Sequence, residues 1–109
     1  MSKNSSNPFP SDVASCFWSF DPGQLDLARD KKEIITQVFN YGNWEAVKWV
    51  RRNYSDDELR EVISSPFRGR WFKQALRFWM MELHISLSDT VYQRAIFDLH
   101  PRGPLVVPA

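Results

Sequence analysis

The chain has 109 residues, of which 43% are apolar, 25% charged and an unusually high 15% aromatic, as expected for one soluble globular domain. A formal net charge of +1 excludes the global field that draws strongly basic proteins to nucleic acid or acidic membranes, so a charged partner must meet a local patch. The single cysteine, Cys16, excludes an internal disulfide and a metal cluster built on cysteines.

The N-terminal part is predicted to lack regular structure. Residues 1–16 are rich in Ser, Asn and Pro, which predicts a flexible arm. The sequence CFWSFDPG follows, and we expect Phe17, Trp18 and Phe20 to form an extended aromatic arm that packs onto the domain before a Pro-Gly turn. No secretion signal is visible, and no apolar run approaches the ~20 residues of a membrane span. We therefore expect a cytoplasmic protein that does not bind membranes.

Residues 26–42, DLARDKKEIITQVFNYG, are predicted to form the first helix. Asp26 can serve as its N-cap, and Gly42 stands where a left-handed C-terminal residue is common. Apolar residues recur on one side of this helix: Leu27, Ile34, Ile35, Val38 and Tyr41.

A second helix is predicted to begin after Asn43, a suitable N-cap. Its buried stripe is predicted from residues that recur at spacings of three and four: Trp44, Val47, Val50 and Tyr54. Trp49 lies roughly 140° from the centre of that stripe. Three alternatives follow for Trp49: cover by the aromatic arm, contact with a partner protein, or simple exposure.

The third helix is predicted to begin at SDDE, where Ser55 and Glu58 can form a capping box, and to stop before Pro66. The fourth, residues 69–85, is apolar over more than half of its circumference. Such a pattern predicts a central helix wrapped by its neighbours. Its core would include Phe78, and its narrow polar strip would consist of Arg70, Lys73, Gln74, Arg77 and His84.

A fifth helix is predicted from Ser88, with Val91, Tyr92, Ala95 and Leu99 on one side. Pro101 would end it and leave residues 101–109 as an extended tail. We therefore predict an all-α fold, in which residues 17–100 form one compact bundle of four to five short helices around the hydrophobic fourth helix.

The sequence presents no arrangement typical of an active site. His84 and His100 do not have the spacing of a metal-binding pair, no glycine-rich loop could hold a phosphate, and Cys16 has no neighbouring base. We predict a non-enzymatic protein without a metal or cofactor.

Charge is distributed unevenly along the chain. Residues 66–84 contain four Lys or Arg and one Glu, whereas residues 55–65 contain four acidic residues and one Arg. The basic strip would bind phosphates or an acidic partner surface, or its long side chains would only solvate the edge of a central helix. The candidate partner-binding residues are Trp49, Arg52, Arg70, Lys73, Arg77 and His84.

Three stretches carry a family resemblance: FWSFDPGQLD, IITQVFNYGNWEAVKWVRRNY and SSPFRGRWFKQALRFWM. In their order and spacing, over residues 17–85, the chain resembles a small all-helical bacterial family of unknown function whose genes lie beside AbiEii-type nucleotidyltransferase toxins. The matching positions are Phe17, Trp18, Asp21, Tyr41, Gly42, Trp44, Trp49, Phe78 and Trp79. The resemblance implies an antitoxin-like partner that binds and neutralises such a toxin. The alternative is a small DNA-binding transcriptional regulator that uses the basic strip.

Overall fold

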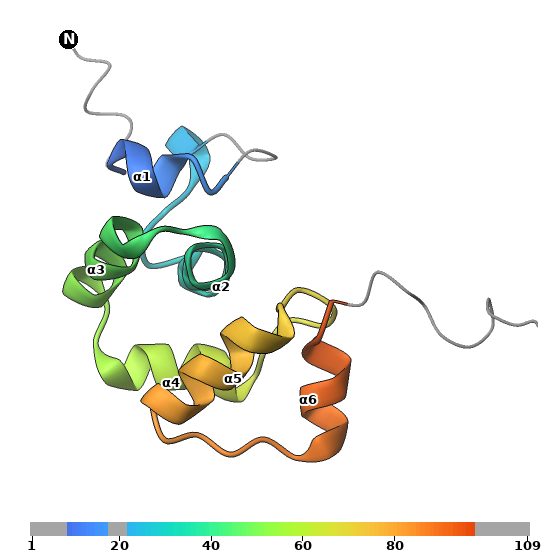
Figure 1. Cartoon of the computed structure of the whole chain (residues 1–109). Coiled ribbons are helices and arrows are strands. Elements are labelled where there is room, and N and C mark those ends of the chain that lie inside the picture. The colour runs from blue at the N-terminus through green and yellow to red at the C-terminus, as the bar shows by residue number, and fades with distance from the viewer. Residues whose placement is uncertain (1–8, 18–21, 98–109) are drawn as a thin grey trace, which may run out of the picture.

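The computed structural model describes residues 9–17 and 22–97, and this part of the chain is all-helical (Figure 1). Within it, the only β-type pairing is an isolated parallel bridge between Trp71 and Ile96. The elements are α1 (Ser11–Ala14), the 3-10 turn η2 (Pro22–Gln24), α2 (Lys31–Tyr41), α3 (Trp44–Asn53), α4 (Asp56–Ser64), α5 (Lys73–Glu82) and α6 (Asp89–Ala95). The predicted all-α bundle is confirmed.

The central helix is α2, and not the helix predicted over residues 69–85. All six side chains of residues 34–39 are buried in α2, whereas only Leu76 and Trp79 are buried within α5. A helix buried around its whole circumference is one that its neighbours surround. Figure 1 views α2 nearly end-on, with α3 on one side and α4 and α5 below it. The aromatic residues of α5 are therefore not all core residues.

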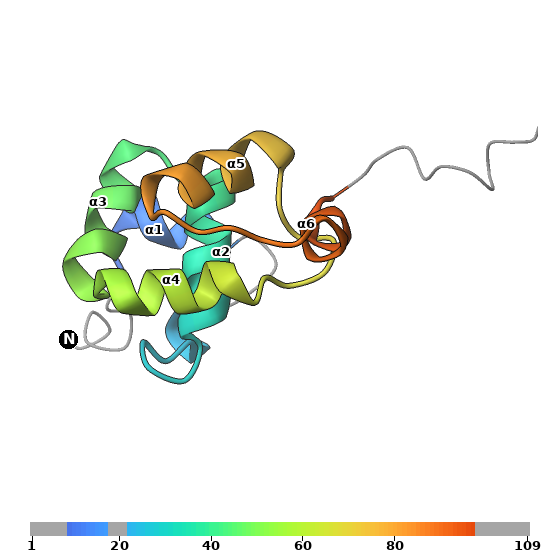
Figure 2. The same cartoon turned by 90° about the horizontal axis from the view of Figure 1, so that it is seen from below.

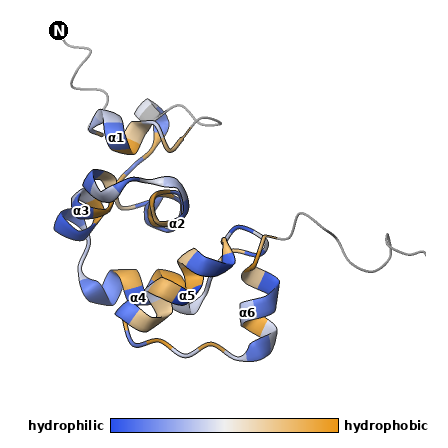
Figure 3. Ribbon diagram, viewed as in Figure 1, coloured by the Kyte–Doolittle hydropathy of each residue, from blue (hydrophilic) through white to orange (hydrophobic). Residues whose placement is uncertain are grey.

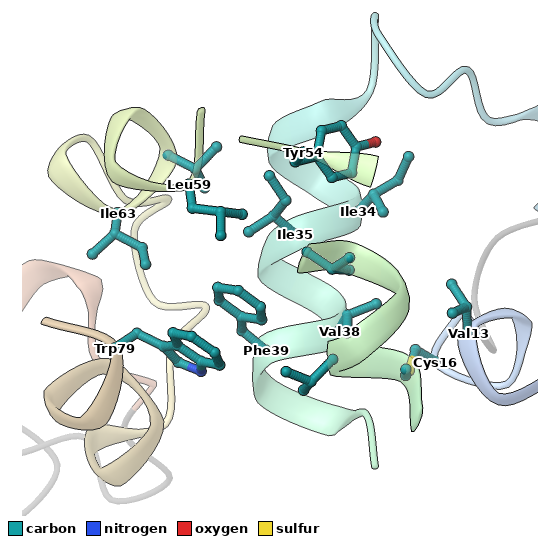
Figure 4. Close-up of a cluster of buried hydrophobic side chains, with 14 of the residues drawn as sticks. Val13, Cys16, Ile34, Ile35, Val38, Phe39, Tyr54, Leu59, Ile63 and Trp79 are labelled. Atoms are coloured by element: carbon teal, nitrogen blue, oxygen red, sulfur yellow. The ribbon is translucent and has the colours of Figure 1, made fainter. Parts of the chain in front are cut away.

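Side chains leave α2 in two directions, as Figure 4 shows. Phe39 points toward α5, where its ring stacks on that of Trp79 with centroids 3.8 Å apart and planes within 5°. Val38 points toward α3 and α1. In Figure 3 the hydrophobic colouring of α3 lies on the side toward α2, and its hydrophilic colouring lies outside. Thus α2 joins two layers of helices through one core.

Three of the predicted helix starts, those at Asn43, Ser55 and Ser88, are confirmed at their N-caps. The side-chain oxygen of Asn43 accepts from the Ala46 N–H at 2.9 Å. Ser55 and Glu58 form the expected capping box, with bonds of 3.1 and 2.8 Å. The side-chain oxygen of Ser88 caps α6 by accepting from the Val91 N–H at 3.2 Å, without a reciprocal bond. Each signal involves residues within one helical turn, which is why it can be read from the sequence.

The first predicted helix differs from the observed one at both ends. Asp26 caps only a turn, accepting from the N–H groups of Ala28 and Arg29, and α2 begins at Lys31. Gly42 is not left-handed: its φ of −80° and ψ of 156° are extended. A Cβ atom at Gly42 would lie 2.7 Å from the carbonyl oxygen of Val38. Lack of space, and not a positive φ, is what requires glycine there.

The two tryptophans of α3 occupy the reverse of their predicted positions. Trp44 is 65% exposed, whereas Trp49 is buried with 8% exposure. The inner face of α3 contacts both α2 and α1, and the ring of Phe9 lies 5.4 Å from that of Trp49. Phe9, which precedes the predicted aromatic arm, therefore covers Trp49. Cover of Trp49 by Phe17, Trp18 and Phe20 stays a prediction, because Trp18 and Phe20 lie outside the described residues.

The N-terminal segment is folded where the structure describes it. Residues 11–14 form α1, and Phe9, Val13 and Cys16 are buried. The flexible arm predicted over residues 1–16 is therefore wrong for residues 9–16. Apolar side chains at positions 9, 13, 16 and 17 provide enough buried surface to dock this short segment on α3.

The predicted fourth and fifth helices are shortened by contact between their outer ends. The Trp71 N–H donates to the Ala95 carbonyl at 2.9 Å, and the Phe97 N–H donates to the Trp71 carbonyl at 2.8 Å. Gly69 therefore lies in a turn and residues 70–72 are not helical, and α6 ends at Ala95. Trp71 is completely buried at this junction. The predicted tail, residues 101–109, and Leu99 lie outside the described residues.

Candidate protein-interaction surface

The predicted partner-binding residues do not form one surface. Trp49 and Phe17 are buried, whereas Trp18 and Phe20 lie outside the described residues. Arg52 is exposed on α3. The sequence pattern included Trp49 because it assigned the wrong face of α3 to the core.

Arg70 has an internal role. Its guanidinium donates to both carboxylate oxygens of Glu33, at 2.6 and 3.3 Å, and to the side-chain oxygen of Gln37 at 2.9 Å. The amide nitrogen of Gln37 in turn donates to the Cys16 carbonyl at 2.8 Å. A partly buried, bidentate Arg–carboxylate pair is strong and geometrically specific. Arg70 therefore connects the segment before α5 to α2 and does not offer a free charge to a partner.

The other predicted basic residues of this region are exposed. Lys73 and Arg77 lie one turn apart on α5, and neither forms an ion pair within the described residues. His84 follows α5 with a positive φ of 59°, which directs the chain away from the helix axis. The basic strip of the prediction therefore reduces to Lys73 and Arg77 on α5, with His84 beyond its end.

Two large apolar side chains share the exposed side of α5 with these cations. Phe78 is 51% exposed and Met81 is 71% exposed. The helix packs on α2 and α4 through Leu76, Trp79 and the following Leu83, so helical geometry turns the remaining positions outward. We define the α5 outer face as Lys73, Gln74, Arg77, Phe78 and Met81. The prediction that Phe78 is a core residue is wrong.

A second exposed apolar feature borders the start of α5. The rings of Tyr41 and Phe72 lie 5.1 Å apart and those of Phe72 and Phe97 6.2 Å apart, all edge to face. The three side chains are between 36% and 44% exposed. We call Tyr41, Phe72 and Phe97 the aromatic ladder. Its position is fixed in part by the side-chain oxygen of Asn40, which accepts from the Phe72 N–H at 2.8 Å.

A cavity connects the aromatic ladder with the α5 outer face. It has a volume of about 340 Å³ and is lined by Lys73, Tyr92, Gln93, Ile96 and Phe97. Lys73 belongs to the α5 outer face and Phe97 to the aromatic ladder, so both features meet at this hollow. Sequence analysis missed the ladder because its members come from three separate segments.

The negative charges predicted beside the basic strip are largely neutralised within the fold. Glu82 pairs with Arg51, whose side chain also pairs with Asp56, at 3.5 and 3.2 Å. Glu58 and Glu61 both contact Lys31. The hydrogen bond from the Ser55 N–H lowers the pKa of Glu58, and the hydrogen bond that Lys31 donates to Glu61 raises the pKa of Lys31. Lys73 and Arg77 therefore give the α5 outer face a positive character.

The Cys16 thiol and the Tyr54 hydroxyl lie in surroundings that keep them in their neutral forms. Burial raises the pKa of the Cys16 thiol, which keeps it in the weakly nucleophilic neutral form. Burial also raises the pKa of Tyr54, whose hydroxyl donates to the Leu27 carbonyl at 2.7 Å. Among residues 9–17 and 22–97 no cluster of three His, Cys, Asp or Glu side chains is placed to hold a metal ion. None of the described helices has the length and apolar character needed to cross a membrane.

Comparison with known proteins relates part of the chain to a family of unknown function. The family DUF6922 matches residues 14–63, which end within α4. No curated protein and no solved structure matches the chain. The similarity thus covers the central α2 and its neighbours α3 and α4, whereas the α5 outer face lies beyond it. The match concerns the sequence alone and carries no information on neighbouring genes.

Proposed function

We propose that this chain is a non-enzymatic protein-interaction module that docks a partner through the α5 outer face and the adjoining aromatic ladder. The partner would present an acidic surface with an apolar recess. Following the family resemblance of the sequence, we propose that this partner is a nucleotidyltransferase-type toxin and that the chain acts as its cytoplasmic antitoxin.

The exposure of Phe78 and Met81 on the same face of α5 as two cations is the observation that carries the proposal. Single exposed apolar residues are common, but two on successive turns of one helix leave an apolar area that a partner can bury. Aromatic residues, Met and Arg are also the residues that protein interfaces favour at their centres.

The positive charges of the α5 outer face favour a partner with an acidic surface. Lys73 and Arg77 lack ion-pair partners within the described residues, so they would steer an acidic surface toward the apolar centre. The neighbouring Glu82 is already paired with Arg51. An acidic partner would therefore meet little repulsion at this face.

Co-expression with a nucleotidyltransferase-type toxin from the same genome tests the proposal. We expect a complex that co-purifies and relieves growth arrest. The double variant Phe78→Ser with Met81→Ser should abolish both effects while the far-UV circular dichroism spectrum stays unchanged, because both side chains are exposed. Trp44→Ser is the matched control, since Trp44 is a large exposed residue on α3. Failure to form any complex, or equal loss of binding in the control, would contradict the proposal.

The alternative function, a DNA-binding regulator, is less well supported because Arg70 is engaged with Glu33. Binding of promoter DNA by Lys73 and Arg77 should weaken with salt, with a slope of roughly one counterion per phosphate contact. Such binding, removed by Lys73→Ala with Arg77→Ala but not by the Phe78 and Met81 double variant, would favour the regulator over the interaction module.

A further inference from the structure

A second cavity, on a different part of the surface, is lined by basic residues and hydroxyl groups. It has a volume of about 320 Å³ and lies between the N-terminal part of α2, the segment after α4 and the C-terminal part of α6. Its polar lining consists of Lys32, Arg68, Arg94, Ser64 and Ser65, and none of its lining residues is acidic. We call it the cationic pocket.

Backbone contacts bring the basic residues of the cationic pocket together. The Gly69 N–H donates to the Arg94 carbonyl at 2.8 Å, so the segment that carries Arg68 lies against the end of α6. Figures 1 and 2 both show the segment between α4 and α5 passing beside α6. Gly69 has a φ of 66°, a conformation that other residues seldom adopt. The positions of Arg68 and Arg94 thus depend on main-chain geometry.

Lys32 reaches the cationic pocket from α2. Its ammonium group lies 4.4 Å from the centroid of the Phe67 ring, and the Arg70 guanidinium lies 5.1 Å from the same centroid. The ring holds Lys32 near the pocket by a cation–π contact. The neighbouring acidic residue, Glu33, forms its ion pair with Arg70 and not with Lys32.

The charges of the cationic pocket are not compensated within the described part of the chain. Lys32, Arg68 and Arg94 form no ion pair there, and like charges around one hollow repel each other. A bound anion would convert this repulsion into attraction and would accept hydrogen bonds from all three side chains.

We propose that the cationic pocket binds the phosphate group of a small ligand, with Lys32, Arg68 and Arg94 as charged donors and the hydroxyls of Ser64 and Ser65 as neutral ones. The volume equals that of about eleven water molecules at roughly 30 Å³ each, which leaves room for an organic group beside the phosphate. Pro66, Val91 and Ala95 supply apolar lining for that group. A phosphate monoester therefore fits the pocket better than inorganic phosphate alone.

Titration of the full chain with inorganic phosphate and, separately, with adenosine monophosphate tests the proposal by heteronuclear NMR. The ionic strength is kept constant with sodium chloride. We expect saturable shifts of the amide signals of Ser64, Ser65, Gly69 and Arg94. Tighter binding of the nucleotide would support recognition of a monoester, and equal affinities would overturn that part of the proposal.

Substitutions distinguish a site from nonspecific attraction. Arg68→Gln and Arg94→Gln should each raise the dissociation constant about tenfold, as expected for loss of one charge-assisted hydrogen bond. Arg52→Gln is the matched control, because Arg52 is an exposed cation on α3 that forms no ion pair within the described residues. Shifts that do not saturate, or an equal effect of Arg52→Gln, would overturn the proposal. Neither result depends on the proposed toxin partner.

Discussion

Replacement of Trp49 by alanine should destabilise the domain far more than the same change at Trp44, although both residues lie on α3. A large aromatic side chain buries up to about 250 Å², so Trp49 at 8% exposure removes about 230 Å² from water and Trp44 at 65% only about 90 Å². At about 25 cal/mol per Å² these areas correspond to upper limits of about 6 and 2 kcal/mol.

Alanine keeps part of the buried area, and the site relaxes after truncation. We therefore expect Trp49→Ala to lower the free energy of unfolding by about 3–5 kcal/mol, the usual range for a buried aromatic residue. Trp44→Ala should lower it by about 1 kcal/mol, also because alanine is the best helix former. Urea denaturation followed by circular dichroism gives both values from the shift of the transition midpoint.

The order of the two effects is the decisive result. Equal losses of stability, or a larger loss for Trp44→Ala, would show that α3 turns its other face to the core. The arrangement of α1, α2 and α3 described above would then be wrong, because the docking of Phe9 on Trp49 requires the observed face.

Two further substitutions test local features of the fold. Gly42→Ala should destabilise the domain by about 1–2 kcal/mol in thermal or urea unfolding, because the new Cβ atom would press on the Val38 carbonyl; unchanged stability would show that the turn has room to adjust. The pKa of Glu58 is lowered in the folded state by the Ser55 N–H, so its stabilisation is full above the ordinary pKa and is lost as the pH falls through the folded-state value. Unfolding measured between pH 2 and about 7 should therefore show a shallower acid loss of stability for Glu58→Gln than for the natural chain, and identical slopes would refute this.

Sequence patterns predicted those parts of the fold that local chemistry controls. The caps at Asn43, Ser55 and Ser88 involve residues three positions apart, and Pro66 limits α4 for a steric reason within one peptide unit. The all-helical character followed from periodicity in the same local way. These features need no knowledge of neighbouring helices.

The side of a helix that faces the core depends on what packs against it. Apolar residues occupy both sides of α3, so the choice between Trp44 and Trp49 depended on the folded segment around Phe9. Likewise, α5 is rich in aromatic residues, which suggested a central helix, although Phe78 is exposed. Periodicity alone cannot separate a core stripe from an apolar docking surface when both lie on one helix.

Contacts between distant segments decided the rest of the candidate site. Arg70 and Glu33 are 37 positions apart, so their pairing removes a cation from the predicted strip in a way that no local pattern indicates. The aromatic ladder joins Tyr41, Phe72 and Phe97 only because the segments around Trp71 and Ala95 bond to each other. Tertiary structure thus both reduced and extended the predicted surface.

The hydrogen bonds that run from Arg70 through Gln37 to the Cys16 carbonyl couple the two ends of the domain. Gln37 is buried, so loss of either bond would leave a desolvated polar atom. Detachment of α1 therefore weakens the bond between Gln37 and Arg70 that holds the segment before α5. Likewise, detachment of that segment weakens the bond between Gln37 and the Cys16 carbonyl. Loosening of either end should therefore lower the protection of backbone amide protons at the other end.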